Sequence, residues 1–438
     1  MSDALTHPRS DDLELLNPGD PAFEAARPRY SGVGDPAVIA RPATDAQIVA
    51  ALALARERGL PISVRSGGHG ARAFPNPGGL VIDMAAFDDI ELLDDGTVRI
   101  GTAATWGEVA EALAPHGLVI TSGDTRDVGV GGLTLGGGMG WLVRAVGLTI
   151  DNLEAVELVT LDGRSIRASA TVEPELFWAL RGGGGNFGIV TRFAIRPTRL
   201  AAIVGGTIRL DPSDLAAALT AWRDAMRQAP DELSATFLSL PAMGPGVPPS
   251  AQIIVCYAGD DEAAGRAAIA PLLELPGVLG DDIARRPYLD LVNPAMTPPP
   301  VRMVGGHGLV DLDDDLIADY VAAVAGFEAP TVASIRYLGG AFGRVPAGAT
   351  AFAVRDKEAM IFRLVMLPAD APDELAAAAA APWERVRTRI SATYGNFVEA
   401  ADPALLPLLY PPATLERLRA VKREFDPENL LTRNHNIV

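Results

Sequence analysis

The sequence predicts an α+β protein with two domains, and three observations lead to this expectation. The first 200 residues alternate strand and helix signals and hold most of the glycine clusters, whereas residues 201–394 join strands and helices through proline-rich loops. A length of 438 residues is too great for one compact core. From Leu415 onward a helical pattern ends in a string of polar and apolar residues, which we expect to dock on the body.

The elements expected in the first domain follow from local signals. A capping-box pattern at Thr44 and a glycine at position 59 predict a helix between them, and a strand follows at 61–64. The segments GLVIDM, DIELL and TVRIG are typical of strands, and Asp95-Gly96 indicates a tight turn between the last two. A helix over 105–116 and a short strand to position 120 complete this set.

The second domain is expected to be a sheet covered by helices. The segments QIIVCYAG, ASIRYLGG and AMIFRLVML are strand-like, while the periodicity over 211–228 and the alanine tract at 376–381 predict helices. The proline-rich segments PAMGPGVPP and NPAMTPPP indicate exposed loops. Cys256 is the only cysteine, so an intrachain disulfide is excluded, and its apolar surroundings predict a buried strand thiol.

Composition excludes several classes of partner. A hydrophobic content of 48% with 21% charged residues is that of a folded protein. The formal charge of −18 repels phosphate backbones and anionic lipid headgroups, so we expect no nucleic-acid partner and no acidic membrane partner. The N-terminal MSDALTHPRSDD lacks the features of a signal peptide, and no run approaches the roughly 20 apolar residues that span a bilayer. We therefore expect a cytoplasmic protein.

Three glycine clusters indicate close approach of a ligand to the main chain. The turn RSGGHG, over 65–70, follows a strand and allows backbone N–H groups to surround an anion. The cluster SGDTRDVGVGGLTLGGGMGWL is so dense in glycine that a large flat cofactor is indicated. FWALRGGGGNFGIVTRF satisfies GxGxxG but follows a helix, which argues against a nicotinamide site. His69 has no neighbour at metal-ligand spacing, so no metal is expected.

Four motifs occur in order along the chain: VRSGGHG, VGVGGLTLGGGMGWLVRAVGLTIDNLEAVELVTLDG, PELFWALRGGGGNFGIVT and RLRAVKREFDPENLLTRNHNI. Together they resemble the berberine-bridge-enzyme-like flavoproteins, whose FAD-binding domain is of the p-cresol-methylhydroxylase (vanillyl-alcohol-oxidase) type. The resemblance covers essentially the whole chain. It implies an FAD-binding domain of residues 1–200 with 395–438 returning to it, and a substrate-binding domain over 201–394 whose sheet closes over the isoalloxazine ring.

The resemblance implies that His69 carries the FAD covalently. In this family the histidine of the RSGGH turn joins the flavin 8α-methyl group, because a neutral imidazole nitrogen can attack the methylene of a quinone-methide tautomer, and the link raises the oxidising power. Many members add a second bond from a cysteine where this chain has Thr125, so a single link is implied. Leu133 stands where members often have a histidine that contacts the ribityl chain.

The same resemblance places further residues of these motifs at the cofactor. They are Arg65, Ser66, Gly67, Gly68, Gly70, Ser122, Thr125, Val128, Gly129, Gly131, Gly132, Leu133, Gly140, Asn186, Gly188, Ile189 and Val190. Polar candidates for the pyrimidine edge of the flavin are Asn396, Asn434 and Asn436.

Oxidation of a C–OH or C–N group sends a hydride to flavin N5 while a proton leaves the heteroatom, so a base is needed. In relatives it is commonly a tyrosine near the start of the terminal helix, and Tyr410 occupies that place, although Pro412 and Thr414 replace the usual glycine and asparagine. A packing tyrosine on a proline loop is the alternative. A free phenol has a pKa of about 10, so the base needs a hydrogen-bonding neighbour, and Tyr394 is the candidate.

These residues predict an FAD-dependent oxidase that acts on a small alcohol, sugar, amine or natural-product intermediate, with dioxygen as the acceptor. The alternatives are a dehydrogenase with another acceptor and a flavin-binding protein without turnover. Arg336, Tyr337 and Arg355 are candidates to line the substrate pocket, with a core or solvated role as the alternative. No pattern in the chain specifies an oligomeric state.

Overall fold

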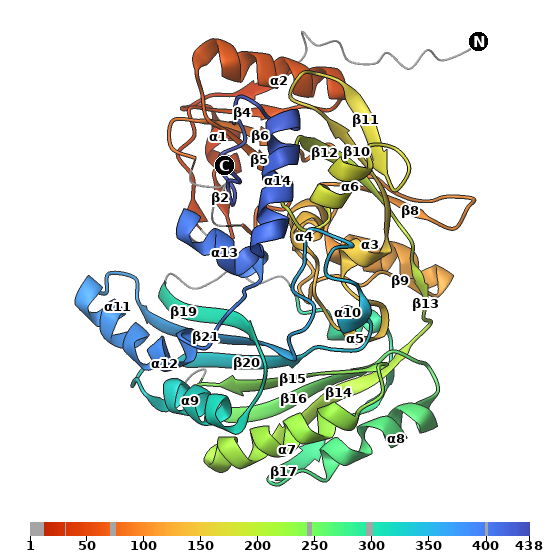
Figure 1. Ribbon diagram of the computed structural model, residues 1–438, viewed down its shortest axis with the longest axis vertical. Helices are drawn as coiled ribbons and strands as arrows, with labels where there is room; N and C mark the ends of the chain where they lie inside the picture. Colours follow the sequence, from red (N-terminus) through yellow and green to blue (C-terminus); the bar gives the residue numbers. More distant parts are fainter. Residues whose placement is uncertain (1–12, 31, 71–75, 243–247, 295–300, 399–401) are drawn as a thin grey trace.

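Two sheet-bearing parts lie one above the other in Figure 1, and the C-terminus lies in the upper part. This computed structural model describes residues 13–30, 32–70, 76–242, 248–294, 301–398 and 402–438. The upper part is built from the described residues up to position 200 and the C-terminal tail, and the lower part from the strands between β14 and β21 with their helices.

The first sheet of the upper part holds the N-terminal strands. Its order is β1 (Glu14–Leu16), β4 (Val38–Arg41), β6 (Leu80–Asp83) and β5 (Ile62–Arg65), and β4, β6 and β5 run parallel. Helix α2 (Asp45–Arg58) packs on it and has the predicted ends, because the Thr44 side chain accepts a hydrogen bond from the Gln47 amide and Gly59 has φ +62°. The short elements α1 (Pro21–Ala26), β2 (Pro28–Arg29) and β3 (Gly32–Val33) lie beside β1 in the sequence.

The second sheet of the upper part is antiparallel. Its order is β11 (Ser165–Ser169), β10 (Leu153–Val159), β12 (Ile189–Ile195), β8 (Val98–Gly101) and β7 (Ile90–Leu92). The predicted turn between β7 and β8 is present, with Gly96 at φ +81°. Helix α3 (Trp106–Leu113) has a capping box from Thr105 to Glu108, and α6 (Pro174–Leu180) precedes the third glycine cluster.

The tail closes against this sheet. Helix α14 (Pro412–Phe425) shares a hydrophobic core with α6 and with β12, through Leu418, Leu176 and Phe193. The helix ends at Phe425, just before the Asp426-Pro427 step, where proline disfavours a helical residue before it. Other short strands and α-helices of the structure are β9 (Leu118–Val119), α4 (Val130–Gly136), α5 (Val143–Val146), β13 (Thr198–Arg199), α10 (Ala341–Arg344) and α13 (Leu406–Leu409).

The lower part is one antiparallel sheet covered by helices on its lower face, as the sequence predicts (Figure 1). Its order is β17 (Val278–Asp281), β14 (Ile203–Leu210), β16 (Ser250–Tyr257), β15 (Leu233–Leu240), β20 (Thr331–Tyr337), β21 (Ala359–Pro368) and β19 (Val301–Val310), and β18 (Ala284–Arg286) pairs with β14. The helices are α7 (Leu215–Gln228), α8 (Glu262–Leu273), α9 (Asp314–Ala325), α11 (Asp373–Ala380) and α12 (Glu384–Arg387). Cys256 is buried on β16, and burial raises the pKa of its thiol.

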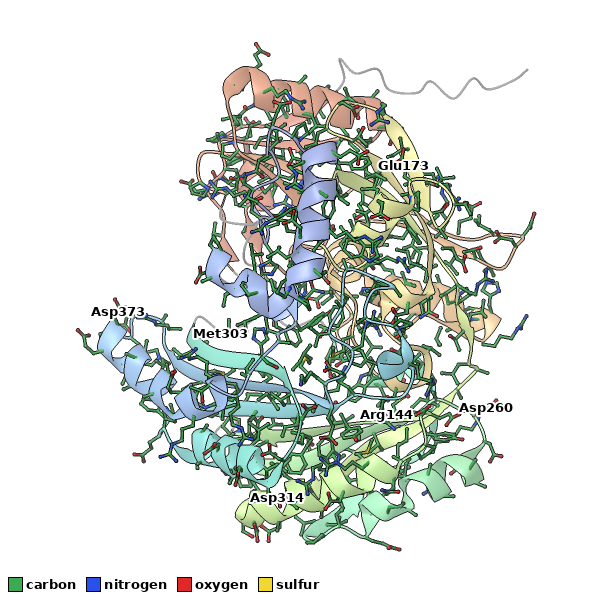
Figure 2. All side chains as sticks on the ribbon, viewed as in Figure 1. Arg144, Glu173, Asp260, Met303, Asp314 and Asp373 are labelled. Carbon is green, nitrogen blue, oxygen red and sulfur yellow. The ribbon has the colours of Figure 1, made fainter. Side chains whose placement is uncertain are left out.

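Buried arginines hold the two parts together. Arg144, on α5, donates hydrogen bonds to the backbone carbonyls of Leu233 and Leu338 and to those of residues 229 and 230, and Figure 2 labels it at the junction. Arg336, on β20, pairs with Asp124 of the upper part. The candidate pocket residue Arg355 similarly pairs with Asp151 at 2.8 Å.

Tyr337 has a structural role of a different kind. Its ring packs in the core between the large sheet and its helices, and its hydroxyl donates to Glu358 at 3.1 Å. The core reading of Arg336, Tyr337 and Arg355 therefore fits their contacts better than a place on a pocket wall.

Some expectations fall outside the described residues, namely MSDALTHPRSDD, residues 243–247 of PAMGPGVPP and residues 295–300 of NPAMTPPP. Within the ranges that the structure describes, none of the helices combines the length and the apolar character required to cross a bilayer. The same ranges contain no group of three or more His, Cys, Asp or Glu side chains arranged to hold a metal ion.

Candidate flavin site

The first two glycine clusters meet in space. A Cβ atom added to Gly67 would lie 2.4 Å from the backbone nitrogen of Gly129, and a Cβ on Gly129 would lie 2.4 Å from the nitrogen of Gly67. Gly67 follows β5, and Gly129 is the N-cap of α4. Because any side chain would force the two backbones apart, glycine at both positions is required for this close contact.

His69 lies in the turn that this contact positions. Its ring stacks on Tyr30, with ring centroids 4.1 Å apart, and its Nε2 atom lies 3.1 Å from Oδ2 of Asp127. This distance is that of an ion pair, but the two groups are not oriented for a hydrogen bond. Nε2 of His69 and Oδ1 of Asp127 are both buried, and neither has a hydrogen-bond partner among the described residues. A partly buried imidazole thus faces a carboxylate at the edge of the loop contact.

Arg65 and Ser66 hold the start of the turn through side-chain contacts. The Arg65 side chain is buried, with Nη2 2.6 Å from Oδ2 of Asp83 and Nη1 donating to the carbonyl of Ala26. The Ser66 hydroxyl lies 3.5 Å from that of Thr102. These contacts hold the end of β5 in place. Gly68, at φ +76°, makes the turn, and Gly70 is the last described residue of the motif.

The third glycine cluster meets the C-terminal tail. The Asn186 side chain donates to the carbonyls of Gly183, at 2.9 Å, and His435, at 3.1 Å. The Asn434 side chain donates to the carbonyl of Gly185 at 2.9 Å. The side-chain oxygens of Asn434 and Asn436 are buried and have no hydrogen-bond partner in the described part of the chain. The tail therefore brings two unsatisfied amide acceptors to the glycine loop.

Tyr394 and Asn396 lie against the second glycine cluster. The Tyr394 hydroxyl accepts hydrogen bonds from the Gly138 amide, at 3.1 Å, and from Nδ2 of Asn396, at 2.8 Å. Asn396 also donates to the carbonyl of Leu133 at 3.0 Å. Burial raises the pKa of Tyr394 above its ordinary value of 10.0, although both hydrogen bonds oppose this effect. The phenol is therefore protonated near neutral pH.

Tyr410 has different surroundings. It lies between α13 and α14, and its hydroxyl donates to the carbonyl of Gly182 at 3.3 Å. Its ring belongs to the core of the upper part together with Val398 and Leu418, whereas Tyr394 belongs to a separate cluster with Phe352. These contacts resemble those of a packing tyrosine.

The remaining predicted residues shape the backbone of the site. Ser122 and Gly140 lie so close that a Cβ on the glycine would be 1.6 Å from the serine carbonyl oxygen. Gly188 precedes β12, whose Ile189 and Val190 point into hydrophobic cores. Four other predicted residues lie in or next to the loop contact. Thr125 forms a β-bridge with Asn293, and the carbonyl of Val128 accepts a hydrogen bond from the Trp106 amide. Gly131 and Gly132 lie at the start of α4.

The residues present fit an FAD. The two glycine loops bring main chain without side chains to one place, where a dinucleotide can be approached closely. His69 places an imidazole at this contact, and the buried Asn434 and Asn436 oxygens are acceptors suited to an N–H group of the flavin ring.

The upper face of the large sheet carries residues that the sequence did not single out. Register places Ser334, Phe362 and His307 in one row across β20, β21 and β19, on the face from which Arg336 reaches the upper part. Phe397, which is 43% exposed, packs edge-on against His307 at 5.9 Å. Figure 2 labels Met303 of β19 at this sheet edge and Asp314 in the helical layer below.

This aromatic row also contacts the predicted site. The rings of Phe397 and Phe362 are 6.0 Å apart, and those of Phe397 and Tyr394 are 5.3 Å apart. Strand alternation in the sequence divides these residues between two faces, but it does not tell which face the flavin-binding part covers. That is why the row was missed.

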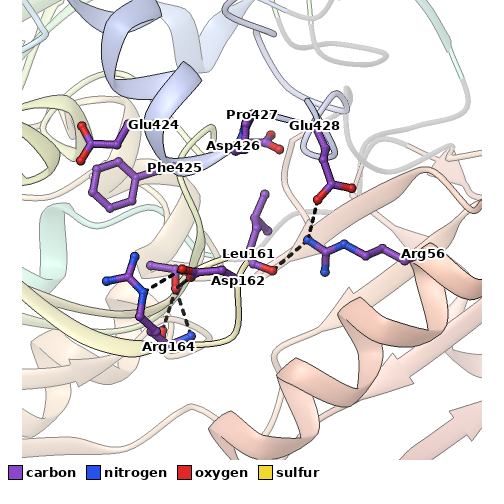
Figure 3. A pocket seen from close by; sticks show the side chains of 10 residues that line it. Arg56, Leu161, Asp162, Arg164, Glu424, Phe425, Asp426, Pro427 and Glu428 are labelled. Atoms are coloured by element: carbon purple, nitrogen blue, oxygen red, sulfur yellow. Dashed lines mark hydrogen bonds and ion pairs between the residues drawn. The ribbon is translucent and has the colours of Figure 1, made fainter.

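A separate cavity of about 200 Å³ lies at the C-terminal end of α14 (Figure 3). It is lined by Arg56, residues 160–162, Arg164 and residues 424–428, and Arg56 and Glu428 form an ion pair at 3.3 Å. None of the predicted site residues lines this cavity. It is thus not part of the flavin site.

Comparison with known proteins identifies the family. A family model described as an FAD binding domain matches residues 36–169. The fold matches that of berberine-bridge-enzyme-like 1 of Physcomitrella patens, with a TM-score of 0.84 and 24% identity over 96% of this chain and 95% of that one. Across 100% of this chain and 99% of the relative, the sequence is 31% identical to (R)-6-hydroxynicotine oxidase of Paenarthrobacter nicotinovorans. The chain belongs to the berberine-bridge-enzyme-like family.

Two further comparisons agree with this assignment. An uncharacterised FAD-linked oxidoreductase of Bacillus subtilis is 30% identical over 87% of this chain and 86% of its own length. The crystal structure of 6-hydroxy-D-nicotine oxidase from Arthrobacter nicotinovorans superposes with a TM-score of 0.86, at 28% identity over 99% of this chain and 100% of that one. The protein is therefore an FAD-dependent oxidoreductase that acts on small organic molecules.

Proposed function

We propose that this oxidoreductase holds its FAD through a covalent bond from His69 and oxidises a small molecule bound between the flavin and the upper face of the large sheet. Dioxygen is the proposed electron acceptor. One observation carries the proposal: His69 lies in the turn where two glycine loops touch, with its ring stacked on Tyr30 and its Nε2 3.1 Å from the Asp127 carboxylate. These contacts fix the orientation of the ring, and Nδ1 is the ring nitrogen that does not face the carboxylate.

The chain supplies binding and orientation, while bound FAD supplies the ring that accepts two electrons. The Gly67–Gly129 contact lets the main chain approach the cofactor. The side-chain oxygens of Asn434 and Asn436 are the proposed acceptors for the flavin pyrimidine ring. In this proposal, His69 near the start of the chain and the two asparagines near its end bind the same cofactor.

We assign the transfer of the substrate proton to Tyr394 in preference to Tyr410. Two donors, the Gly138 amide and Asn396, point at the Tyr394 oxygen and partly offset the effect of burial, which raises the pKa of this phenol. Tyr410 instead donates to a backbone carbonyl inside a core. Tyr394 also touches Phe397, which connects it to the aromatic row on the sheet.

The aromatic row supports a substrate that carries a ring. Phe362, Phe397 and His307 offer ring edges and faces, which favour contact with another flat apolar group. Ser334 and the histidine add hydrogen-bonding groups to the row. The full-length relative is named as an oxidase, which supports dioxygen as the acceptor.

Three measurements test this function. Denatured protein should keep yellow fluorescence on a gel and yield a His69 peptide with added FAD mass, and His69→Ala should lose both signals. Ring-bearing alcohols and amines should bleach the flavin without air more readily than sugars do. Air should then restore the colour faster than an artificial quinone. Release of all flavin on denaturation would refute the covalent link, and a reduced protein that air leaves bleached would refute dioxygen as the acceptor.

A further inference from the structure

We propose that Asp127 is a positioning residue for flavin attachment: its carboxylate holds the Nε2 proton of His69 and leaves Nδ1 as the nitrogen that bonds to the flavin. The inference rests on the proposed covalent link at His69. It assigns a role to an acid that the sequence motifs did not single out.

The distance between the two side chains carries the inference. Oδ2 of Asp127 lies 3.1 Å from Nε2 of His69, so a small rotation of either group makes a hydrogen bond. Both Nε2 and the second carboxylate oxygen are buried and lack a hydrogen-bond partner in the described chain. Tyr30 stacks on the imidazole and limits the tilt of its ring. The Asp127 carboxylate thus lies beside Nε2 of His69, a buried nitrogen that has no hydrogen-bond partner in the described chain.

The backbone fixes Asp127 on both sides. The carbonyl of Arg126 accepts a hydrogen bond from the Gly107 amide at 2.9 Å, and the carbonyl of Val128 accepts one from the Trp106 amide at 3.0 Å. The loop is therefore attached to the first turn of α3, while the Gly67–Gly129 contact ties it to the turn of His69. Such a support keeps an acid at a constant distance from the imidazole.

The charge of Asp127 remains directed at His69. Arg126, its sequence neighbour, pairs with Glu111 on α3 instead. The Asp127 side chain is 33% exposed and that of His69 is 19% exposed. The carboxylate is therefore partly shielded, so its effect on the imidazole is larger than in free solution, and a proton can still pass from it to water.

The attachment reaction needs such a group. One bond forms, between Nδ1 and the 8α carbon, while a C–H bond of the methyl group and the N–H bond of the imidazole break. The two electrons remain on the flavin ring and pass to dioxygen, which takes up the two protons as hydrogen peroxide. A carboxylate at Nε2 selects the tautomer with a free Nδ1 lone pair and stabilises the positive charge that develops on the imidazole.

The test uses the full chain, produced under flavin depletion and then mixed with FAD in air. Gel fluorescence gives the rate of covalent attachment, and filtration gives total bound FAD. Asp127→Asn keeps the shape of the side chain and should bind a full complement of FAD, yet attach it roughly 100-fold more slowly. Asp127→Glu should recover part of the rate, because it restores a carboxylate. Asp315→Asn, an exposed acid on α9, is the matched control.

Each other result decides against the inference. Attachment by Asp127→Asn at the wild-type rate, or loss of all FAD binding in that variant, would show that Asp127 has no role in the chemistry or only an architectural one. Peptide fragmentation that locates the flavin on Nε2 would also overturn it. If the wild-type protein itself forms no covalent flavin, the proposed link at His69 fails and this inference fails with it. The wild-type protein therefore tests the covalent link, and the Asp127→Asn variant tests the role of Asp127 separately.

Discussion

At the scale of single residues, two tyrosines separate by their hydrogen bonds. The Tyr394 oxygen accepts from the Gly138 amide and Asn396, which is an arrangement for a polar function. Tyr410 donates to the carbonyl of Gly182 and is surrounded by core side chains. The family resemblance pointed first to Tyr410, near the start of the terminal helix, but the sequence does not show which donors face each tyrosine oxygen.

Tyr394→Phe should lower kcat by roughly 100-fold to 10,000-fold, because it removes the proposed proton-transfer group. Covalent flavin content should stay unchanged, since His69 is not touched. Steady-state kinetics and the visible spectrum of the denatured protein measure the two quantities.

Tyr410→Phe is the matched variant. It loses one hydrogen bond to a carbonyl, so it should cost about 1 kcal/mol of unfolding free energy and leave kcat within a few fold. A larger loss of kcat in Tyr410→Phe than in Tyr394→Phe would reverse the assignment.

At the scale of elements, Glu358 joins three segments of the lower part. Its carboxylate accepts hydrogen bonds from Arg227 of α7, from the Leu312 amide ahead of α9 and from Tyr337 of β20. Burial acts to raise the pKa of Glu358, but the hydrogen bond and charge of Arg227 and the Leu312 amide outweigh it and hold the pKa below 4.5. The ionised carboxylate is therefore part of the packing of these elements.

Acidification should weaken this junction. The folded state binds the proton of Glu358 less readily than the unfolded chain, so the stabilisation is complete above pH 4.5 and is lost as pH falls through the lower folded pKa. Glu358→Gln lacks this titration, so its unfolding free energy should fall less steeply than wild type as pH drops below 4.5.

Urea titrations at a series of pH values measure this difference. Asp315→Gln, at an exposed acid of α9, serves as the control and should follow the wild-type curve. Parallel curves for wild type and Glu358→Gln would contradict the prediction.

At the scale of the whole molecule, Arg144 couples the two parts. Its guanidinium is buried and has four backbone carbonyls as acceptors, while its charge lies 5.1 Å from the centre of the Tyr337 ring. Burial lowers the pKa of Arg144. A planar group with fixed donors serves several carbonyls at once, which a lysine cannot do.

Arg144→Ala should lower the unfolding free energy by roughly 3 kcal/mol, because it leaves buried carbonyls without donors. Arg144→Lys should recover little of that loss. Guanidinium titrations followed by tryptophan fluorescence measure both.

The exposed Arg344, which pairs with Asp231, provides the comparison, and Arg344→Ala should cost less than about 1 kcal/mol. Equal losses for Arg144→Ala and Arg344→Ala would show that the buried arginine does not couple the two parts.

Local signals in the sequence predicted much of the fold because they depend on neighbouring residues only. The Thr44 cap, the Gly59 end and the Asp95-Gly96 turn are all present, since each needs only a few adjacent residues. The same holds for the glycine turn at His69, whose small residues already indicate close backbone contact. A buried strand thiol at Cys256 also follows from its apolar neighbours.

Other features depend on residues that are distant in sequence. The pairing of Asp127 with His69 joins two loops, and the row of Ser334, Phe362 and His307 joins three strands. Arg336 was a candidate for the pocket wall, but it pairs with Asp124 across the junction. No local pattern specifies such contacts, because register and domain contact are set by the packing of the complete chain.

The sequence alone determined the class of fold, the family and its cofactor. Helix caps, glycine turns and the four family motifs are each short runs of neighbouring residues, which can be recognised without the tertiary structure. Only the tertiary structure decided which side chains share the site: an acid beside His69, two donors at Tyr394 and an aromatic row on the sheet. The physical reason is that hydrogen bonds and ring contacts act over a few ångströms in space, and the order of residues does not record those distances.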